Sequence, residues 1–324
     1  MKNNLKKFLK FLIISACVYA FLLLLIKTEF INRYYERVLM TIGINIILAL
    51  SLNLITGFTG QLALGHAGFM SIGAYTAAVL TMQFNMPLVI SMIGGGIMAG
   101  LFGYLIGLPT LRLKGDYLAI TTLGFGEIIR VIINNINKLG GSQGLTGIPM
   151  KSTFTWVYVV MIITIIIIFN IIHSSLGRAM ISVREDEVAA EAMGINTTKY
   201  KIIAFVIGSF FAGIAGGLYA HFTGYLDPVS FNFIQSTFIV MYVVLGGLGS
   251  IWGCVVATGV LTYLPEMLRN VSTTVSDLRM VIYPILLIVM MRFCPRGVVG
   301  LKNMIGEFIF SKSRGGKSVA AGNK

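Results

Sequence analysis

The sequence predicts an all-α integral membrane protein, a polytopic helical bundle of about 8–10 transmembrane helices with one short helix in a cytoplasmic loop. Of the 324 residues, 56% are hydrophobic and 11% are charged. Soluble domains average about 45–50% apolar and about 25% charged residues, so the surplus apolar surface is best placed in lipid. The 37 glycines agree with this placement, because small residues let transmembrane helices approach closely.

Ten segments are candidate spans, since a spanning helix needs about 20 apolar residues. The third is rich in Gly and Ala, and we expect a broken or partly re-entrant helix that protein or a water-filled cavity surrounds. The eighth and ninth meet at GGLGSIWG, so they form either two spans or one bent unit. The ten segments cover roughly residues 8–26, 38–55, 62–82, 87–108, 117–136, 156–173, 202–222, 234–252, 253–270 and 279–293.

The distribution of Lys and Arg predicts the orientation, because cytoplasmic loops carry an excess of both. With the N-terminus inside and ten spans, 17 of the 25 basic residues fall on inner segments and 8 on outer segments. We therefore expect a multi-pass membrane protein with both termini, and the loop 174–201, in the cytoplasm. The net charge of +13 is then mostly a topology signal, and we expect no nucleic-acid partner.

The chain divides into three parts on this basis. Residues 1–37 hold an N-terminal cytoplasmic segment, the first span and an outer loop. Residues 38–300 form one transmembrane domain, which includes the loop 174–201, and residues 301–324 form a polar cytoplasmic tail.

The loop stands out because SVREDEVAAEAMGINTTKYK is rich in charge between two apolar runs. Acidic residues favour a helix N-terminus, which Glu185 and Asp186 would supply. Gly194 suits the end of that helix, and either Asn196 or Thr197 suits the cap of the next helix. The spacing predicts one apolar face, formed by Val188, Ala189, Ala192 and Met193, with Glu187 and Glu191 on the other side.

An exposed apolar face on this helix indicates a partner. One interpretation is a solvated connector, although most connections are much shorter than this loop. Helices that lie on membrane surfaces are usually rich in Lys and Arg, whereas this one is acidic. A protein partner therefore fits better than a lipid surface.

Several stretches resemble one transporter family, in that family's order over about residues 40–300. They are TGFTGQLALGHAGFMSIGAYTAA (56–78), LRLKGDYLAITTLGFGEIIR (111–130), GGSQGLTGIP (140–149), the acidic loop, VLGGLGSIWG (244–253) and CPRGVVG (294–300). The sequence thus resembles the permease subunits of branched-chain amino-acid ABC importers, the LivM type. The loop departs from the general importer pattern, because Glu187 is one place early and no Leu-Pro follows.

The resemblance implies that the acidic helix is a coupling helix, which docks on a cytoplasmic ATPase subunit and transmits its movement to the spans. The ATPase-coupling residues it implies are Gly177 and Arg178 before the helix, and Arg184, Glu185, Asp186, Glu187, Val188, Ala189, Ala190, Glu191, Ala192, Met193 and Gly194 in it. The implied partners are two ATPase subunits, a second homologous permease subunit, an extracytoplasmic substrate-binding protein and membrane lipid. ATP would bind the partner subunits, so this chain would need no cofactor of its own and would not be an enzyme. No catalytic or metal-binding residue is expected.

The Gly-rich third segment supplies candidate residues for the substrate pathway. A polar ring at membrane depth indicates function, although His66 could equally bond a neighbouring carbonyl. Gly60, Gly65, Gly68 and Gly73 permit either close packing or an unwound pathway segment.

Charged and polar residues elsewhere have two interpretations each. Glu127 and Arg130 are spaced to pair on one helix, either in the pathway or as an ion pair at the outer edge. His173 and His221 fall at ends of predicted spans, where we expect an interfacial position. Two GxxG pairs, at residues 57–60 and 246–249, do not establish an internal repeat.

By this resemblance, the expected function is ATP-driven import of leucine, isoleucine and valine by alternating access. The same family could instead import urea, short amides or other amino acids. An ion-driven secondary transporter or channel would require a buried acidic or basic relay, for which the spans offer few candidates. A membrane-embedded enzyme is disfavoured because there are only three His and no nucleophile with a plausible base.

Overall fold

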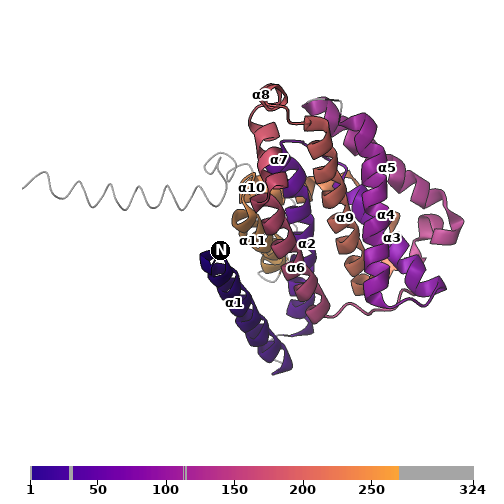
Figure 1. Cartoon of the computed structure of the whole chain (residues 1–324). Coiled ribbons are helices and arrows are strands. Elements are labelled where there is room, and N and C mark those ends of the chain that lie inside the picture. Colours follow the sequence, from indigo (N-terminus) through magenta and orange to yellow (C-terminus); the bar gives the residue numbers. More distant parts are fainter. Residues whose placement is uncertain (1, 29–31, 112, 114, 270–324) are drawn as a thin grey trace, which may run out of the picture.

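The computed structural model describes residues 2–28, 32–111, 113 and 115–269, and this part of the chain is almost entirely helical (Figure 1). The predicted span 279–293, the motif 294–300 and the tail 301–324 lie outside the described residues. The α-helices are α1 (Lys2–Lys27), α2 (Arg33–Thr59), α3 (His66–Gln83), α4 (Leu88–Thr110), α5 (Asp116–Asn135), α6 (Phe154–His173), α7 (Ser175–Glu185), α8 (Glu187–Ala192), α9 (Thr197–Thr223), α10 (Phe233–Gly246) and α11 (Ile251–Arg269). Short 3₁₀ turns η1 (Asn137–Leu139), η2 (Gly141–Gln143) and η3 (Pro228–Phe231) and strands β1 (Leu145–Thr146) and β2 (Tyr225–Leu226) connect them.

The all-α polytopic membrane architecture is confirmed. Within the described residues, α2, α4, α6 and α9 are long and apolar enough to cross a membrane. Shorter apolar helices cover Ile13–Lys27, Phe233–Gly246 and Ile251–Met267. The first nine predicted segments correspond in order to α1–α6 and α9–α11, although the segment 234–252 also includes the first two residues of α11.

Helix α2 lies at the centre of the bundle. It packs against α6, α9, α10 and α11, and Figure 1 shows it enclosed by the other helices. Its side chains from Ile46 to Ile55 are buried on every face, as expected for a helix that is apolar all round.

Helices α3, α4 and α9 form a tightly packed layer beside α2. A β-carbon added to Gly73 would lie 2.2 Å from the Cα atom of Gly213 on α9. One added to Gly95 on α4 would lie 2.5 Å from the carbonyl oxygen of Gly73. The three backbones therefore touch only because these positions lack side chains.

Helices α10 and α11 are two separate helices that pack against each other. A turn over residues 247–250 joins them, and the backbone of Gly246 packs directly on Cys254. Helix α10 has 14 residues and is about 21 Å long, which is shorter than a hydrocarbon core of about 30 Å. The predicted span 234–252 is wrong in this respect, because the glycine-rich turn ends the helix early.

At the end of α9 far from α8, two connections pair with each other. Strands β1 and β2 form an antiparallel ladder, in which Leu145 lies opposite Leu226 and Thr146 opposite Tyr225. The N–H of Ile148 donates to the carbonyl of Gly224 at 3.3 Å. The GGSQGLTGIP stretch is therefore folded against the chain that follows α9.

Candidate functional site: the α7–α9 connection and a polar cavity

The acidic loop contains two helices rather than one. Helix α7 ends at Glu185 and α8 begins at Glu187, with a break at Asp186, whose φ of −157° is extended. The prediction of one helical body from Arg184 to Gly194 is therefore wrong, because Arg184 and Glu185 end α7. Gly177 and Arg178 precede α8, as predicted, but they lie in a helix of their own, α7.

Local capping interactions define α8, as the sequence predicted. The side chain of Asp186 accepts hydrogen bonds from the N–H groups of Val188 at 2.9 Å and Ala189 at 3.0 Å. Gly194 ends the helix with a φ of +82°, a conformation that favours glycine. Of the two candidate caps for α9, Asn196 is the cap, since its side chain accepts from the N–H of Lys199 at 3.0 Å.

Two acidic residues fasten α8 to the first turns of α9. Lys201 Nζ lies 2.6 Å from Glu187 Oε1, and the Lys201 side chain is only 10% exposed. Thr197 Oγ1 donates to Glu191 Oε1 at 2.7 Å. Ala190 is the buried residue of the short helix, so α8 is held against α9 by both polar contacts and packing.

The opposite face of α8 is apolar and exposed. Val188 is 71% exposed and Met193 is 82% exposed, and Ala189 and Ala192 are also exposed. Figure 1 places α8 at the extremity of the bundle, away from the packed helices. The predicted apolar face is confirmed, and within the described chain no other element covers it.

The remaining residues predicted for coupling lie on α7. A β-carbon at Gly177 would lie 2.2 Å from the carbonyl oxygen of Ile172, so glycine permits the bend between α6 and α7. Arg178 Nη1 donates to the carbonyl oxygen of His173 at 3.4 Å. Arg184 pairs with Glu185 and reaches the carbonyl of Gly57 on α2.

Three of the glycines predicted for the pathway, Gly65, Gly68 and Gly73, lie at close contacts between helices. A β-carbon at Gly65 would lie 2.0 Å from the carbonyl oxygen of Thr122 on α5, and one at Gly68 would lie 2.9 Å from the Cα atom of Gly126. Gly73 packs on α4 and α9 as described above. Gly60 ends α2 with a φ of +75°.

His66 is buried where α3 begins. Its Nε2 atom lies 2.7 Å from Ser51 Oγ on α2, and its Nδ1 atom has no hydrogen-bond partner within the described chain. The preceding residues 61–65 are not helical and are mostly buried. Surrounding protein therefore covers this irregular backbone, as expected at membrane depth.

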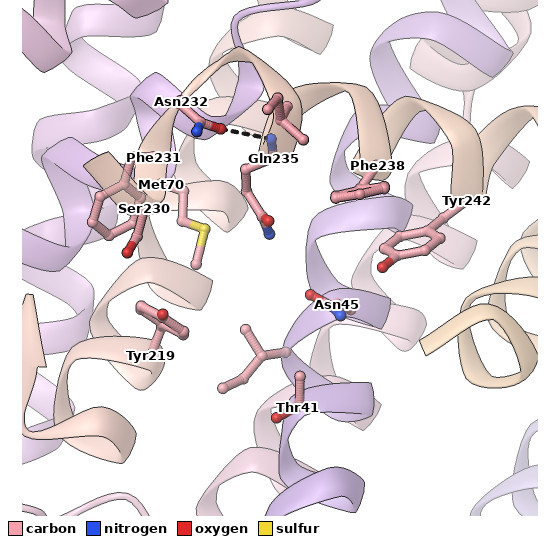
Figure 2. A pocket seen from close by; sticks show the side chains of 12 residues that line it. Thr41, Asn45, Met70, Tyr219, Ser230, Phe231, Asn232, Gln235, Phe238 and Tyr242 are labelled. Atoms are coloured by element: carbon pink, nitrogen blue, oxygen red, sulfur yellow. Dashed lines mark hydrogen bonds between the residues drawn. The ribbon is translucent and has the colours of Figure 1, made fainter. Parts of the chain in front are cut away.

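A cavity of about 460 Å³ opens between α2, α3, α9, η3 and α10 (Figure 2). Figure 2 shows the carboxamide of Gln235 pointing into its centre, with Asn45 on the facing helix. The Asn232 side chain accepts from the N–H of Gln235 at 3.1 Å and so fixes the start of α10. Its twelve lining residues are Thr41, Ile44, Asn45, Met70, Tyr219, Ser230, Phe231, Asn232, Ile234, Gln235, Phe238 and Tyr242.

The cavity combines neutral polar groups with apolar walls. Hydroxyl and carboxamide groups come from α2, α9, η3 and α10, while Met70, Phe231 and Phe238 supply apolar surface. None of the twelve lining residues is charged. Its volume falls within the usual range of about 300–1,000 Å³ for small-molecule sites.

The sequence analysis missed this cavity. None of the six residues predicted for the pathway lines it. Asn45 and Gln235 were visible as polar residues inside apolar segments, a signal that indicates function by default in membranes. Glu127 lies next to the cavity, because its Oε1 atom accepts from the N–H of Phe233 at 3.0 Å, between two lining residues.

Comparison with known proteins identifies the family. Residues 34–291 match the model of the branched-chain amino acid transport system permease component. The chain belongs to this permease family. It is 33% identical to the high-affinity branched-chain amino acid transport system permease protein LivM of Escherichia coli, over 91% of this chain and 75% of that protein. It is 29% identical to LivH of the same bacterium, over 57% of this chain and 59% of LivH.

A third relative of this permease has a different cargo in its name. The guanosine ABC transporter permease protein NupQ of Bacillus subtilis is 26% identical, over 52% of this chain and 60% of NupQ. The resemblance to the LivM type is confirmed, and the chain is a multi-pass transport subunit of the ABC transporter class.

Proposed function

We propose that this chain is the transmembrane permease subunit of an ATP-driven importer that carries leucine, isoleucine and valine across a bacterial cytoplasmic membrane by alternating access. The observation that supports it most directly is the neutral, mixed cavity in a chain of the permease family. The end of the bundle that carries α8 faces the cytoplasm, as do both termini, in line with the distribution of Lys and Arg.

The chemistry of the cavity suits a zwitterion with an apolar side chain. Carboxamide and hydroxyl groups hydrogen-bond both ammonium and carboxylate groups. The apolar walls accept a branched side chain. The lining has no charged side chain that could form an ion pair with the cargo. The cavity therefore binds the cargo weakly and releases it easily. Selection among cargoes then belongs to an extracytoplasmic binding protein.

The exposed face of α8 is the surface for the ATPase. Its apolar side chains project beyond the packed helices, while its acidic side chains hold it to α9. A capped helix fastened at its base transmits displacement, whereas an unstructured loop would absorb it. Two cytoplasmic ATPase subunits supply ATP hydrolysis, one for this permease and one for its partner permease.

The second permease is a homologous subunit of the LivH kind. LivH is itself related to this chain at 29% identity, so the two transmembrane subunits of the complex share one fold and one pathway. The β1–β2 ladder caps the outer end of this subunit, where a binding protein delivers the cargo.

Reconstitution tests the proposal. The chain is expressed with its ATPase subunits, its partner permease and its binding protein, and the complex is placed in liposomes. Uptake of radiolabelled leucine is measured with and without ATP, and with excess valine, guanosine or urea. We expect ATP-dependent uptake that valine inhibits and guanosine and urea do not. If guanosine or urea inhibits uptake and valine does not, the cargo belongs to another substrate class. Uptake that an ion gradient drives without ATP would refute the ABC mechanism.

A matched pair of variants ties the cavity to transport. Gln235→Leu removes the carboxamide at the cavity centre and keeps the size of the side chain. Thr237→Val makes a comparable change on the exposed side of the same helix. We expect uptake to fall about tenfold or more in Gln235→Leu, because the cargo loses a hydrogen-bonding partner in the cavity. Uptake should change little in Thr237→Val.

A further inference from the structure

Arg184 occupies a site lined by glycines from two distant segments. Its Nη1 atom donates to the carbonyl oxygen of Gly57, near the end of α2, at 2.8 Å. A β-carbon at Gly60 would lie 3.1 Å from Arg184 Cγ, and one at Gly249 would lie 2.6 Å from Arg184 Nη1. Three of the four glycines in the two GxxG pairs therefore lie at one arginine. We call Arg184, Gly57, Gly60 and Gly249 the Arg184 cluster.

Asn53 ties the two sides of this cluster together. Its side-chain N–H donates to the carbonyl of Ser250 at 3.0 Å, and its Oδ1 atom accepts from the N–H of Gly249 at 3.1 Å. A β-carbon at Gly57 would lie 2.5 Å from the N atom of Gly249. The end of α2 and the α10–α11 turn are thus in backbone contact, and both touch the arginine.

These two segments lead directly to the cavity. Helix α2 contributes Thr41, Ile44 and Asn45 to its lining, and α10 contributes residues from Ile234 to Tyr242. Gly57 and Asn45 lie on the same straight helix, about 18 Å apart at 1.5 Å per residue. The cluster is therefore continuous, through α2 and α10, with two walls of the cavity.

On its other side, the cluster belongs to the connection that carries α8. Arg184 is in the last turn of α7, immediately before the break at Asp186, and it also pairs with Glu185. Acidic contacts fasten α8 to α9, which contributes only Tyr219 to the cavity. Within the described residues, Arg184 makes the side-chain hydrogen bond that joins this connection to α2.

We propose that Arg184 is the positioning residue that transmits movement of the α7–α8 connection to α2 and to the α10–α11 turn, and so sets the width of the cavity. The inference rests on the proposed function. Guanidinium suits this role because its planar fork of donors can hold a carboxylate and a carbonyl at once, whereas an ammonium is a single point of charge. Glycine at the three other positions lets the arginine approach both backbones.

A purely structural role would also explain a partly buried hydrogen bond, so the test measures coupling between ATP hydrolysis and transport. The complete complex is reconstituted with Arg184→Gln, Arg184→Lys or, as a matched control, Lys199→Gln. Lys199 is an exposed cation at the start of α9 on the same face of the protein. For each, we measure recovery of the assembled complex, ATP hydrolysis without cargo, and leucine transported per ATP.

Arg184→Gln is expected to assemble and to hydrolyse ATP at the unstimulated rate of the wild type, while leucine transported per ATP falls about tenfold or more, as for a lost charged hydrogen bond. Arg184→Lys should give an intermediate ratio and Lys199→Gln the wild-type ratio. An unchanged ratio in Arg184→Gln would overturn the proposal. If that variant does not assemble, Arg184→Lys decides, and a wild-type ratio there overturns it.

A second measurement follows the cavity itself. In a chain whose cysteines are replaced by serine, Ser230→Cys places a thiol in the cavity wall. Its labelling rate with a soluble maleimide is compared with and without ATP and vanadate. ATP should change the labelling rate when Arg184 is present, and should not change it in the protein that also carries Arg184→Gln. An equal change in both would refute transmission through Arg184, whereas a wild-type complex that transports no leucine would refute the proposed function instead.

Discussion

The carboxylate of Glu127 on α5 accepts a hydrogen bond from the backbone N–H of Phe233, the first residue of α10, at 3.0 Å. Its other oxygen lies 2.7 Å from Nε of Arg130, one turn further along α5. The predicted pair exists, but it is more than an ion pair at the edge of a helix. It fixes the position of α10 where that helix enters the wall of the cavity.

The two partners of Glu127 can be separated by mutation. Glu127→Ala leaves the N–H of Phe233 without its acceptor and should cost about 1–3 kcal/mol, with reduced uptake. Glu127→Gln retains an acceptor, and Arg130→Gln leaves the bond to Phe233 intact, so both should be milder. Thermal unfolding in detergent and leucine uptake check the order. Equal losses in Arg130→Gln and Glu127→Ala would show that the ion pair matters instead.

The contact of Gly73 with Gly213 sets the separation of α3 and α9. Gly73→Val would place a side chain where 2.2 Å is available and should cost about 1–3 kcal/mol or more. Gly124→Ala is the control, because nothing lies within 4 Å of its β-carbon position on α5. That change should be neutral or stabilising by up to about 1 kcal/mol. Melting temperatures of the purified variants test both expectations.

The cap of α8 predicts local stability. Asp186→Ala removes two hydrogen bonds and should destabilise the helix by about 1 kcal/mol, while Asp186→Asn should be nearly neutral. Amide exchange across residues 187–192 should become about fivefold faster in the alanine variant. Unchanged exchange would mean that α9, rather than the cap, holds α8 in shape.

The ion pair between Glu187 and Lys201 predicts a charge-swap result. It is partly buried, so either single reversal should cost about 1–2 kcal/mol. Glu187→Lys combined with Lys201→Glu should recover at least half of that loss. Melting temperatures of the four proteins form the double-mutant cycle, and additive losses would show that the two residues do not interact.

If the exposed face of α8 binds the ATPase subunits, a charge placed on it should weaken that binding. Met193→Glu adds charge to an 82% exposed apolar residue and should weaken capture of the ATPase subunits about tenfold, as for a residue at the centre of an interface. Lys138→Gln, at the far end of the molecule, is the control. Co-purification of the ATPase with tagged permease measures the effect, and wild-type capture by Met193→Glu would exclude this face.

Features that depend on near neighbours in the chain could be predicted from the sequence. The helix of the acidic loop, its end at Gly194 and its apolar face follow from interactions within a turn or two. So do the apolar helices and the Glu127–Arg130 pair, which lie three residues apart. The break at Asp186 was missed, because nothing in the local sequence separates Arg184 and Glu185 from the helix that follows. In the structure these two residues end α7, and Arg184 contacts Gly57 on α2.

Features that combine distant segments could not be predicted. The cavity needs side chains from four helices, and no spacing along the chain brings Asn45 to Gln235. His221, expected at an interface, is fully buried, where its Nε2 lies 2.8 Å from Thr81 Oγ1. The glycines were recognised, but their neighbours were not, and the neighbours decide whether a glycine lines a pathway or lets two backbones touch.

The contact between Gly73 and Gly213 also has a consequence for biosynthesis. The ribosome makes α3 before α9, so the surface of α3 around Gly73 lacks its α9 partner until α9 has been made. Helix α4 can cover part of that surface, but α9 emerges only after α8 has been made. The order in which these helices enter the membrane therefore differs from the order in which they complete their packing.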